Sequence, residues 1–144
     1  MTSTQWDVRA VFPLSLGEFV VWLACGLTMA FGREALGLET ALKLHAIAAP
    51  VFAALASLLY FTRCRRVTPL AAAAFFTVFI IVLDAALVVP VFEKSYAMFG
   101  SILGTWLPFL SIFAATFLTG TWIVGRSGQL SGRVPGAAIN SRRS

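Results

Sequence analysis

Asp84 is the residue whose place in the sequence points most directly to chemistry. It stands inside an apolar run, and its neighbours at helical spacing are Ile80, Ile81, Leu87 and Val88. In a membrane helix it would lie about 12 Å from the end of its span, where an unpaired carboxylate costs several kcal/mol. Removal from water favours the neutral acid, which is the property that a proton carrier needs. The alternative is an Asp that joins helices through a hydrogen bond.

Two other polar residues lie at depths that match Asp84, and two more lie nearer the outer end of the spans. Ser101 and Thr105 are four residues apart and therefore share one face of a helix. His45 lies just inside the end of another apolar run, and Arg33 lies in the connection before it. We predict that these side chains and Asp84 line one polar pocket that opens to the outside of the membrane.

Three prolines add backbone acceptors to this predicted pocket. Proline has no N–H, so in an α-helix it leaves the carbonyl four residues earlier without its usual donor. The free carbonyls are expected at Ala46, Ala86 and Gly104, before Pro50, Pro90 and Pro108. In lipid such groups need a neighbouring helix or water, although plain proline kinks are also common there.

Glu18 is the second acid in an apolar run, about two turns from the start of the first expected span. Arg63 and Arg9 are long enough to reach it from the membrane boundary, and Thr119 lies at a similar depth. One expectation is an ion pair between the first two spans. The other is a second proton site on the inner side of the membrane. Trp22, near the middle of the first span, lies outside the usual aromatic belts and is assigned to packing.

These residues have to be positioned by helices in lipid. The chain has 144 residues, of which 59% are hydrophobic and 12% charged, whereas about 25% of an ordinary soluble domain is charged. Runs of about 20 apolar residues cross a bilayer as helices. The predicted fold class is therefore all-α, an integral membrane four-helix bundle over residues 1–125 with short loops. The expected spans are 12–31, 44–62, 70–92 and 96–124, and the expected loops are 32–43, 63–69 and 93–94.

The last apolar run is longer than the hydrocarbon core requires. We expect it to tilt, to kink at Pro108 or to project beyond the lipid.

The basic residues predict the orientation. Of the eleven lysines and arginines, eight fall on one side of a four-span topology, and the positive-inside rule makes that side cytoplasmic. Both termini then lie in the cytoplasm, and the protein lies in a bacterial inner (plasma) membrane. Residues 126–144 form a basic tail that we expect to be disordered or held against anionic lipid. This topology explains the net charge of +5 without a nucleic-acid partner.

Small residues predict where helices touch. Gly100 and Gly104 form one pair at four-residue spacing, and Ala49 and Ala53 form another. Such residues let helix backbones approach closely. The pattern suits packing within one chain and packing in a homo-oligomer equally, so the expected partners are the lipid bilayer and further copies or other membrane subunits.

The sequence predicts no cofactor and no metal site. Cys25 lies in an apolar run and Cys64 in a basic loop, and they form no C-x-x-C pair. The single histidine argues against a bis-His haem within one chain. Because no nucleophile–base pair or pair of carboxylates stands at a suitable spacing, a membrane enzyme ranks third among the possible functions.

The segment Tyr96-Ala-Met-Phe-Gly-Ser-Ile-Leu-Gly-Thr-Trp-Leu-Pro108 resembles a stretch of small four-span bacterial membrane proteins of unassigned function. The likeness covers the last three spans and implies no activity. From the residues themselves we expect proton- or cation-linked transport or permeation by an oligomer that uses Asp84. The alternative is a non-catalytic subunit or assembly factor of a larger membrane complex.

Overall fold

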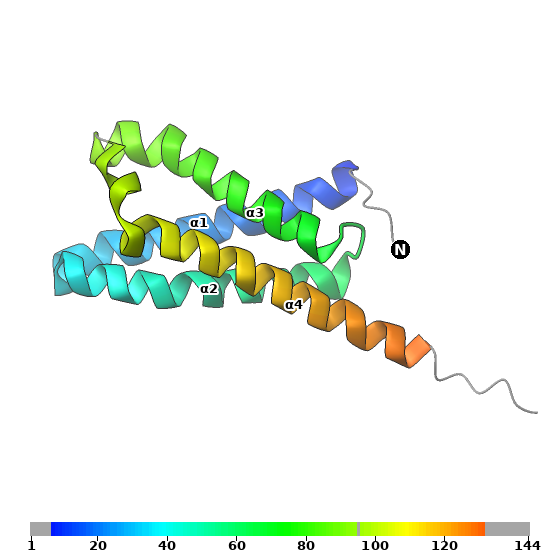
Figure 1. Cartoon of the computed structure of the whole chain (residues 1–144). Helices are drawn as coiled ribbons and strands as arrows, with labels where there is room; N and C mark the ends of the chain where they lie inside the picture. Colours follow the sequence, from blue (N-terminus) through cyan, green and yellow to red (C-terminus); the bar gives the residue numbers. More distant parts are fainter. Residues whose placement is uncertain (1–6, 95, 132–144) are drawn as a thin grey trace, which may run out of the picture.

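The computed structural model describes residues 7–94 and 96–131, and all regular structure within these ranges is helical (Figure 1). Three π- and 3₁₀-helical segments, η1 to η3, interrupt the α-helices between Asp84 and Trp106. The elements in chain order are α1 (Val8–Leu36), α2 (Leu38–Arg63), α3 (Pro69–Leu83), the π-helix η1 (Asp84–Glu93), the 3₁₀-helix η2 (Tyr96–Gly100), the π-helix η3 (Ile102–Trp106) and α4 (Leu107–Ser131).

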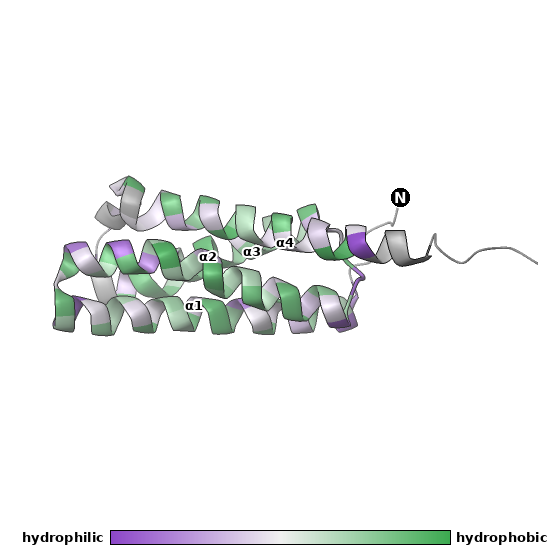
Figure 2. Cartoon of the chain, turned by 90° about the horizontal axis from the view of Figure 1, so that it is seen from below, coloured by the Kyte–Doolittle hydropathy of each residue, from purple (hydrophilic) through white to green (hydrophobic). Residues whose placement is uncertain are grey.

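The helical path contains four segments that are long and apolar enough to cross a membrane. These are Val8–Leu36, Leu38–Arg63, Pro69–Val91 and Gly104–Arg126. Large apolar side chains stand on their outward faces, among them Phe12, Ile47 and Leu110, each about two-thirds exposed in the isolated chain. Figure 2 shows the hydrophobic colouring along the helices and the most hydrophilic segments near the two ends of the bundle. The predicted all-α class with four membrane-length helices is thereby confirmed.

The four helices form a closed ring of side-by-side neighbours. α1 packs beside α2 and α3, and α4 packs beside the same two helices, so α1 and α4 lie diagonally across the core. The seam between α1 and α3 is the sparsest of the four. Figure 1 shows both ends of the ring. The Asp7 end carries the start of α1, the α2–α3 loop and the last turns of α4. The Gly37 end carries the α1–α2 turn and the segments η1 to η3.

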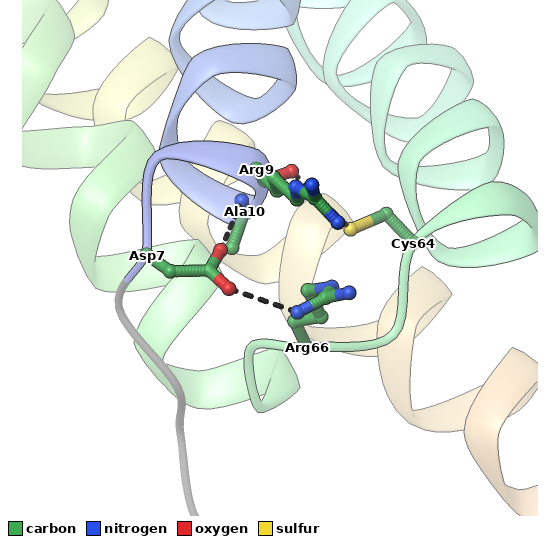
Figure 3. Close-up of polar contacts among 5 residues, drawn as sticks. All are labelled: Asp7, Arg9, Ala10, Cys64 and Arg66. Carbon is green, nitrogen blue, oxygen red and sulfur yellow. Dashed lines mark hydrogen bonds and ion pairs between the residues drawn. The ribbon is translucent and has the colours of Figure 1, made fainter.

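Polar contacts close the Asp7 end (Figure 3). Asp7 caps α1, because its Oδ1 accepts a hydrogen bond from the N–H of Ala10 at 2.8 Å. Its Oδ2 also accepts from Nη1 of Arg66, in the loop after α2, at 2.8 Å. Thr68 caps α3 in the same way, with Pro69 in the first turn. One carboxylate therefore joins the start of α1 to the α2–α3 loop.

The first two helices, α1 and α2, are longer than the apolar runs that predict them. The expected connection 32–43 is almost entirely helical, and α1 and α2 are separated only by Gly37, whose φ of 82° suits glycine. Hydropathy misses this because Arg33 to Thr40 are polar enough to leave the lipid but still form helix.

The fourth apolar run is also interrupted where no break was expected. Extended backbone at Ser101 separates η2 from η3, and a continuous helical path starts only at Ile102. At the other end, α4 continues through Arg126 to Ser131, so the first residues of the expected disordered tail are helical. The remaining tail residues, 132–144, lie outside the described ranges.

Glycines mark the closest approaches between helices. A Cβ at Gly120 would meet Cε2 of Phe61 at 2.7 Å and Cβ of Pro69 at 2.9 Å, so α4 touches both α2 and the start of α3 there. Within the predicted pair, a Cβ at Gly104 would lie 3.1 Å from Cδ2 of Leu42, whereas a Cβ at Gly100 would meet nothing within 4 Å. The sequence pattern thus pointed to one of these contacts and missed the tighter one at Gly120. Ala49 and Ala53 are fully buried in α2.

We predict that Gly120→Ala destabilises the bundle by roughly 1–3 kcal/mol, because the added methyl overlaps two packed side chains. Unfolding by sodium dodecyl sulfate in mixed micelles, followed by helical circular dichroism, measures this. Gly26→Ala is the matched control, since a Cβ at Gly26 meets nothing within 4 Å and alanine favours helix. Equal unfolding curves for the two variants would contradict the close approach.

Candidate functional site

Asp84 bonds to a side chain on another helix. Its Oδ1 accepts a hydrogen bond from Nε1 of Trp22, on α1, at 2.9 Å. Both side chains are half-buried, and the contact crosses the sparse seam between α1 and α3. Trp22, which the sequence analysis assigned to packing, is therefore a polar partner of the acid. An indole N–H is a donor only, so it suits a carboxylate oxygen.

The backbone changes at Asp84. Its N–H is shared between the carbonyls of Ile80 and Ile81, and the π-helix η1 begins at this residue. π-Helices occur mostly as single turns and frequently at functional sites; η1 runs for 10 residues and ends at Lys94, which has a left-handed φ of 52°. Apart from the Trp22–Asp84 bond, the backbone of η1 lies close to α3 and η2 and not to α1 or α2, among the residues that the structure describes. Beyond Asp84, therefore, the chain leaves α1.

Pro90 lies within η1, which alters the prediction about its free acceptor. In a π-helix each N–H bonds the carbonyl five residues earlier. The carbonyl without a donor is then that of Ala85, whereas α-helical spacing predicted Ala86.

The other predicted pocket residues lie at the Gly37 end, each in a distinct setting. Ser101 caps η3, because its Oγ accepts from the N–H of Gly104 at 3.0 Å. Thr105 is 3% exposed, and its N–H bonds the Ser101 carbonyl at 3.1 Å. His45 is half-buried on α2, and its Nδ1 has no hydrogen-bond partner among the described residues. Arg33 is exposed in the last turn of α1 rather than in a loop.

His45 and η3 are brought near one another by α2. Leu42, one helical turn before His45, contacts the Gly104 position of η3. Two hollows on the surface of the described residues lie elsewhere. One runs between α2 and α4 and is lined by Val51, Ala54, Leu55, Leu58, Leu118, Thr119, Thr121 and Trp122. The other is lined by Leu27, Thr28, Phe31, Gly32, Ala35, Leu36 and Leu44.

Glu18 faces the bundle core and makes no ion pair with Arg63 or Arg9. Its side chain is 0% exposed, and neither carboxyl oxygen has a hydrogen-bond partner among the described residues. The two arginines are exposed at the Asp7 end. The predicted ion pair is therefore wrong. The reason is the helical period: Glu18 lies in line with the buried Leu14 and Val21, so it points away from the boundary where the arginines stand.

Ser57 on α2 and Thr116 on α4 share the setting of Glu18. Each is 0% exposed, and each hydroxyl is without a hydrogen-bond partner in the part of the chain that the structure describes. The sequence analysis named Thr119 for this depth, but Thr119 is only half-buried. The signal that identifies Thr116 is its spacing of four residues from Ile112 and Gly120, which are also buried.

The site holds no group of metal-ligating side chains among the described residues. Among the described residues, no three His, Cys, Asp or Glu side chains are grouped closely enough to hold a metal ion, and Cys25 and Cys64 are free thiols. Comparisons with protein-family models, curated proteins and solved structures found no match. The functional assignment therefore rests on the residues just described.

We predict that Trp22 and Asp84 are energetically coupled by about 1.5–3 kcal/mol, the range for hydrogen bonds to charged groups. A double-mutant cycle with Trp22→Phe, Asp84→Asn and the double variant measures the coupling, again from unfolding in mixed micelles. Trp106→Phe is the matched control, since the Trp106 indole donates to the carbonyl of Phe99 at 2.8 Å and should add independently to Asp84→Asn. Additive effects for Trp22→Phe would refute the bond.

Proposed function

We propose that the protein is a small polytopic inner-membrane protein that moves protons or small cations as an oligomer, with Asp84 as the residue that binds them. The observation that carries this proposal is the Trp22–Asp84 hydrogen bond at the start of η1. The four apolar helices support membrane insertion. The arginines at the Asp7 end, Arg9, Arg63, Arg65, Arg66 and Arg126, favour a cytoplasmic location for that end.

A proton or cation on Asp84 changes what holds α1 to α3. The carboxylate accepts a charge-assisted hydrogen bond from the Trp22 indole. Once the negative charge is neutralised, that bond weakens. The seam it crosses is the sparsest in the ring, and beyond Asp84 the described backbone of η1 does not lie close to α1. Binding at Asp84 therefore shifts the balance between a closed and an open α1–α3 seam at the Gly37 end.

An oligomer supplies what one chain lacks. Side chains from the four helices fill the core of the bundle. Asp84 does not line either of the two surface hollows described above. A second copy against the α1–α3 seam encloses a path beside Asp84. Oligomeric transport proteins commonly place intramembrane acids on such paths.

We predict that Asp84→Asn abolishes proton flux into liposomes that contain the purified protein. The measurement uses a trapped pH-sensitive dye and a potassium diffusion potential, with protein-free liposomes as background. Wild type should exceed this background, whereas the amide cannot take up a proton or neutralise a cation. Trp22→Phe should retain flux but alter its dependence on pH, because it leaves the acid and removes its donor.

Glu39→Gln is the matched control for this experiment. Glu39 is an exposed acid at the Gly37 end that pairs with Lys43 at 2.7 Å, so its loss should leave the flux unchanged. Full flux in Asp84→Asn, or no wild-type flux of protons, sodium or potassium, would contradict the proposed function.

The hollow between α2 and α4 favours a second candidate function, that of a subunit or assembly factor. It is apolar and open along two packed helices, so a helix of another membrane protein fits there. Purification in mild detergent tests this. A foreign membrane protein recovered in stoichiometric amount, and lost in Ala54→Trp, would support the second candidate over the first.

A further inference from the structure

Three polar side chains meet the bundle core without hydrogen-bond partners. Glu18 on α1, Ser57 on α2 and Thr116 on α4 are each 0% exposed. Both carboxyl oxygens and both hydroxyl oxygens are buried and unpartnered among the described residues. A buried polar group without a hydrogen bond destabilises a fold, so the bundle keeps these three side chains at a cost in stability.

Glu18 and Ser57 lie at the same level of the bundle. The Gly17 position of α1 faces Cβ of Ala56 on α2, at 3.9 Å from an ideal Cβ. Glu18 and Ser57 are the next residues along these two helices, and both turn toward the core.

Thr116 lies at that level too. Gly120 of α4 is pressed against the ring of Phe61 on α2. Thr116 and Ser57 each precede this contact by four residues, about one helical turn on the same face. Because α2 and α4 are parallel neighbours, the two hydroxyls occupy the same layer as the carboxyl of Glu18.

The chemistry of this layer selects its ligand. The polar atoms that could contact a ligand in this layer are all oxygens, which excludes metals that need nitrogen or sulfur ligands. A single carboxyl balances a single positive charge, so a divalent ion would leave excess charge in hydrocarbon. The arginines of the described ranges are exposed. The buried or half-buried titratable groups on the described helices around Glu18 are Cys25 on α1, Tyr60 and His45 on α2, and Asp84 at the start of η1.

We infer that Glu18 forms a proton-binding site in the layer that it shares with Ser57 and Thr116. The carboxyl holds an exchangeable proton, and the two hydroxyls, which are not bonded to it in this structure, turn toward it when it ionises. A hydroxyl both accepts from a protonated acid and donates to a carboxylate, so the same two groups serve both states. The site lies toward the Asp7 end, and Asp84 lies toward the Gly37 end.

This inference goes beyond the proposed function, because it concerns the carboxyl of Glu18 and can be tested independently of transport at Asp84. Its test is labelling by dicyclohexylcarbodiimide, which adds to protonated carboxyls in apolar surroundings. The full chain is reconstituted in liposomes, and the peptide that contains Glu18 is identified by its mass increase.

We predict stoichiometric labelling of Glu18 at neutral pH, slowing as the pH rises and absent in Glu18→Gln. Thr116→Val should raise the pH of half-maximal labelling, since it removes a group that solvates the ionised acid. Thr121→Val is the matched control, because Thr121 is exposed on the same helix and should leave the midpoint unchanged. Asp84→Asn should also leave it unchanged.

The opposite outcomes are equally distinct. An unlabelled Glu18 in wild type, or equal midpoints for Thr116→Val and wild type, would overturn the site. Protection of Glu18 by sodium ions at fixed pH would show a sodium site instead. The variant Glu18→Leu distinguishes a structural role of Glu18 from proton binding. The midpoint of unfolding should rise in this variant if the acid is kept for proton binding, and fall if the acid supports the fold.

Discussion

Every polar group inside this bundle has to find its hydrogen-bond partner within the bundle, because neither hydrocarbon nor packed apolar side chains supply one. The helical backbone meets this requirement by itself. The side chains meet it unevenly. Thr77 and Ser111 bond to carbonyls of their own helices, Asp84 reaches Trp22 on a neighbouring helix, and Glu18 has no partner among the described residues. These differences set Asp84 and Glu18 apart from the polar residues that bond within their own helix.

The number of membrane-length helices followed from hydropathy, but their ends did not. An apolar run reports how much chain lipid can cover, whereas a helix continues for as long as its backbone bonds are favourable. The α1–α2 hairpin illustrates the difference, since Arg33 to Thr40 remain helical on both sides of Gly37. The break at Ser101 depends on a local cap, in which one hydroxyl replaces a helical partner for Gly104. Hydropathy does not detect such a cap inside an apolar segment.

The candidate site could be predicted in part. The energetic cost of a carboxylate in lipid singled out Asp84 and Glu18 from sequence alone. Their partners depended on how neighbouring helices are aligned, which a single sequence does not contain. Trp22 was visible only as an aromatic residue out of place, and its donor role required α1 and α3 to be side by side. For Glu18 the helical period of α1 gave no prediction from sequence, because apolar residues surround Glu18 on all faces of the helix and only the structure shows that Leu14 and Val21 lie on the buried one.

The contact between Asp7 and Arg66 has a mechanical consequence. It ties the start of α1 to the loop that leads into α3, so these two helices share a pivot at one end of the molecule. A small rotation about a pivot produces its greatest displacement at the far end of each arm. Trp22 and Asp84 lie well along those arms, where a change of a few degrees in the angle between the helices is enough to separate donor from acceptor.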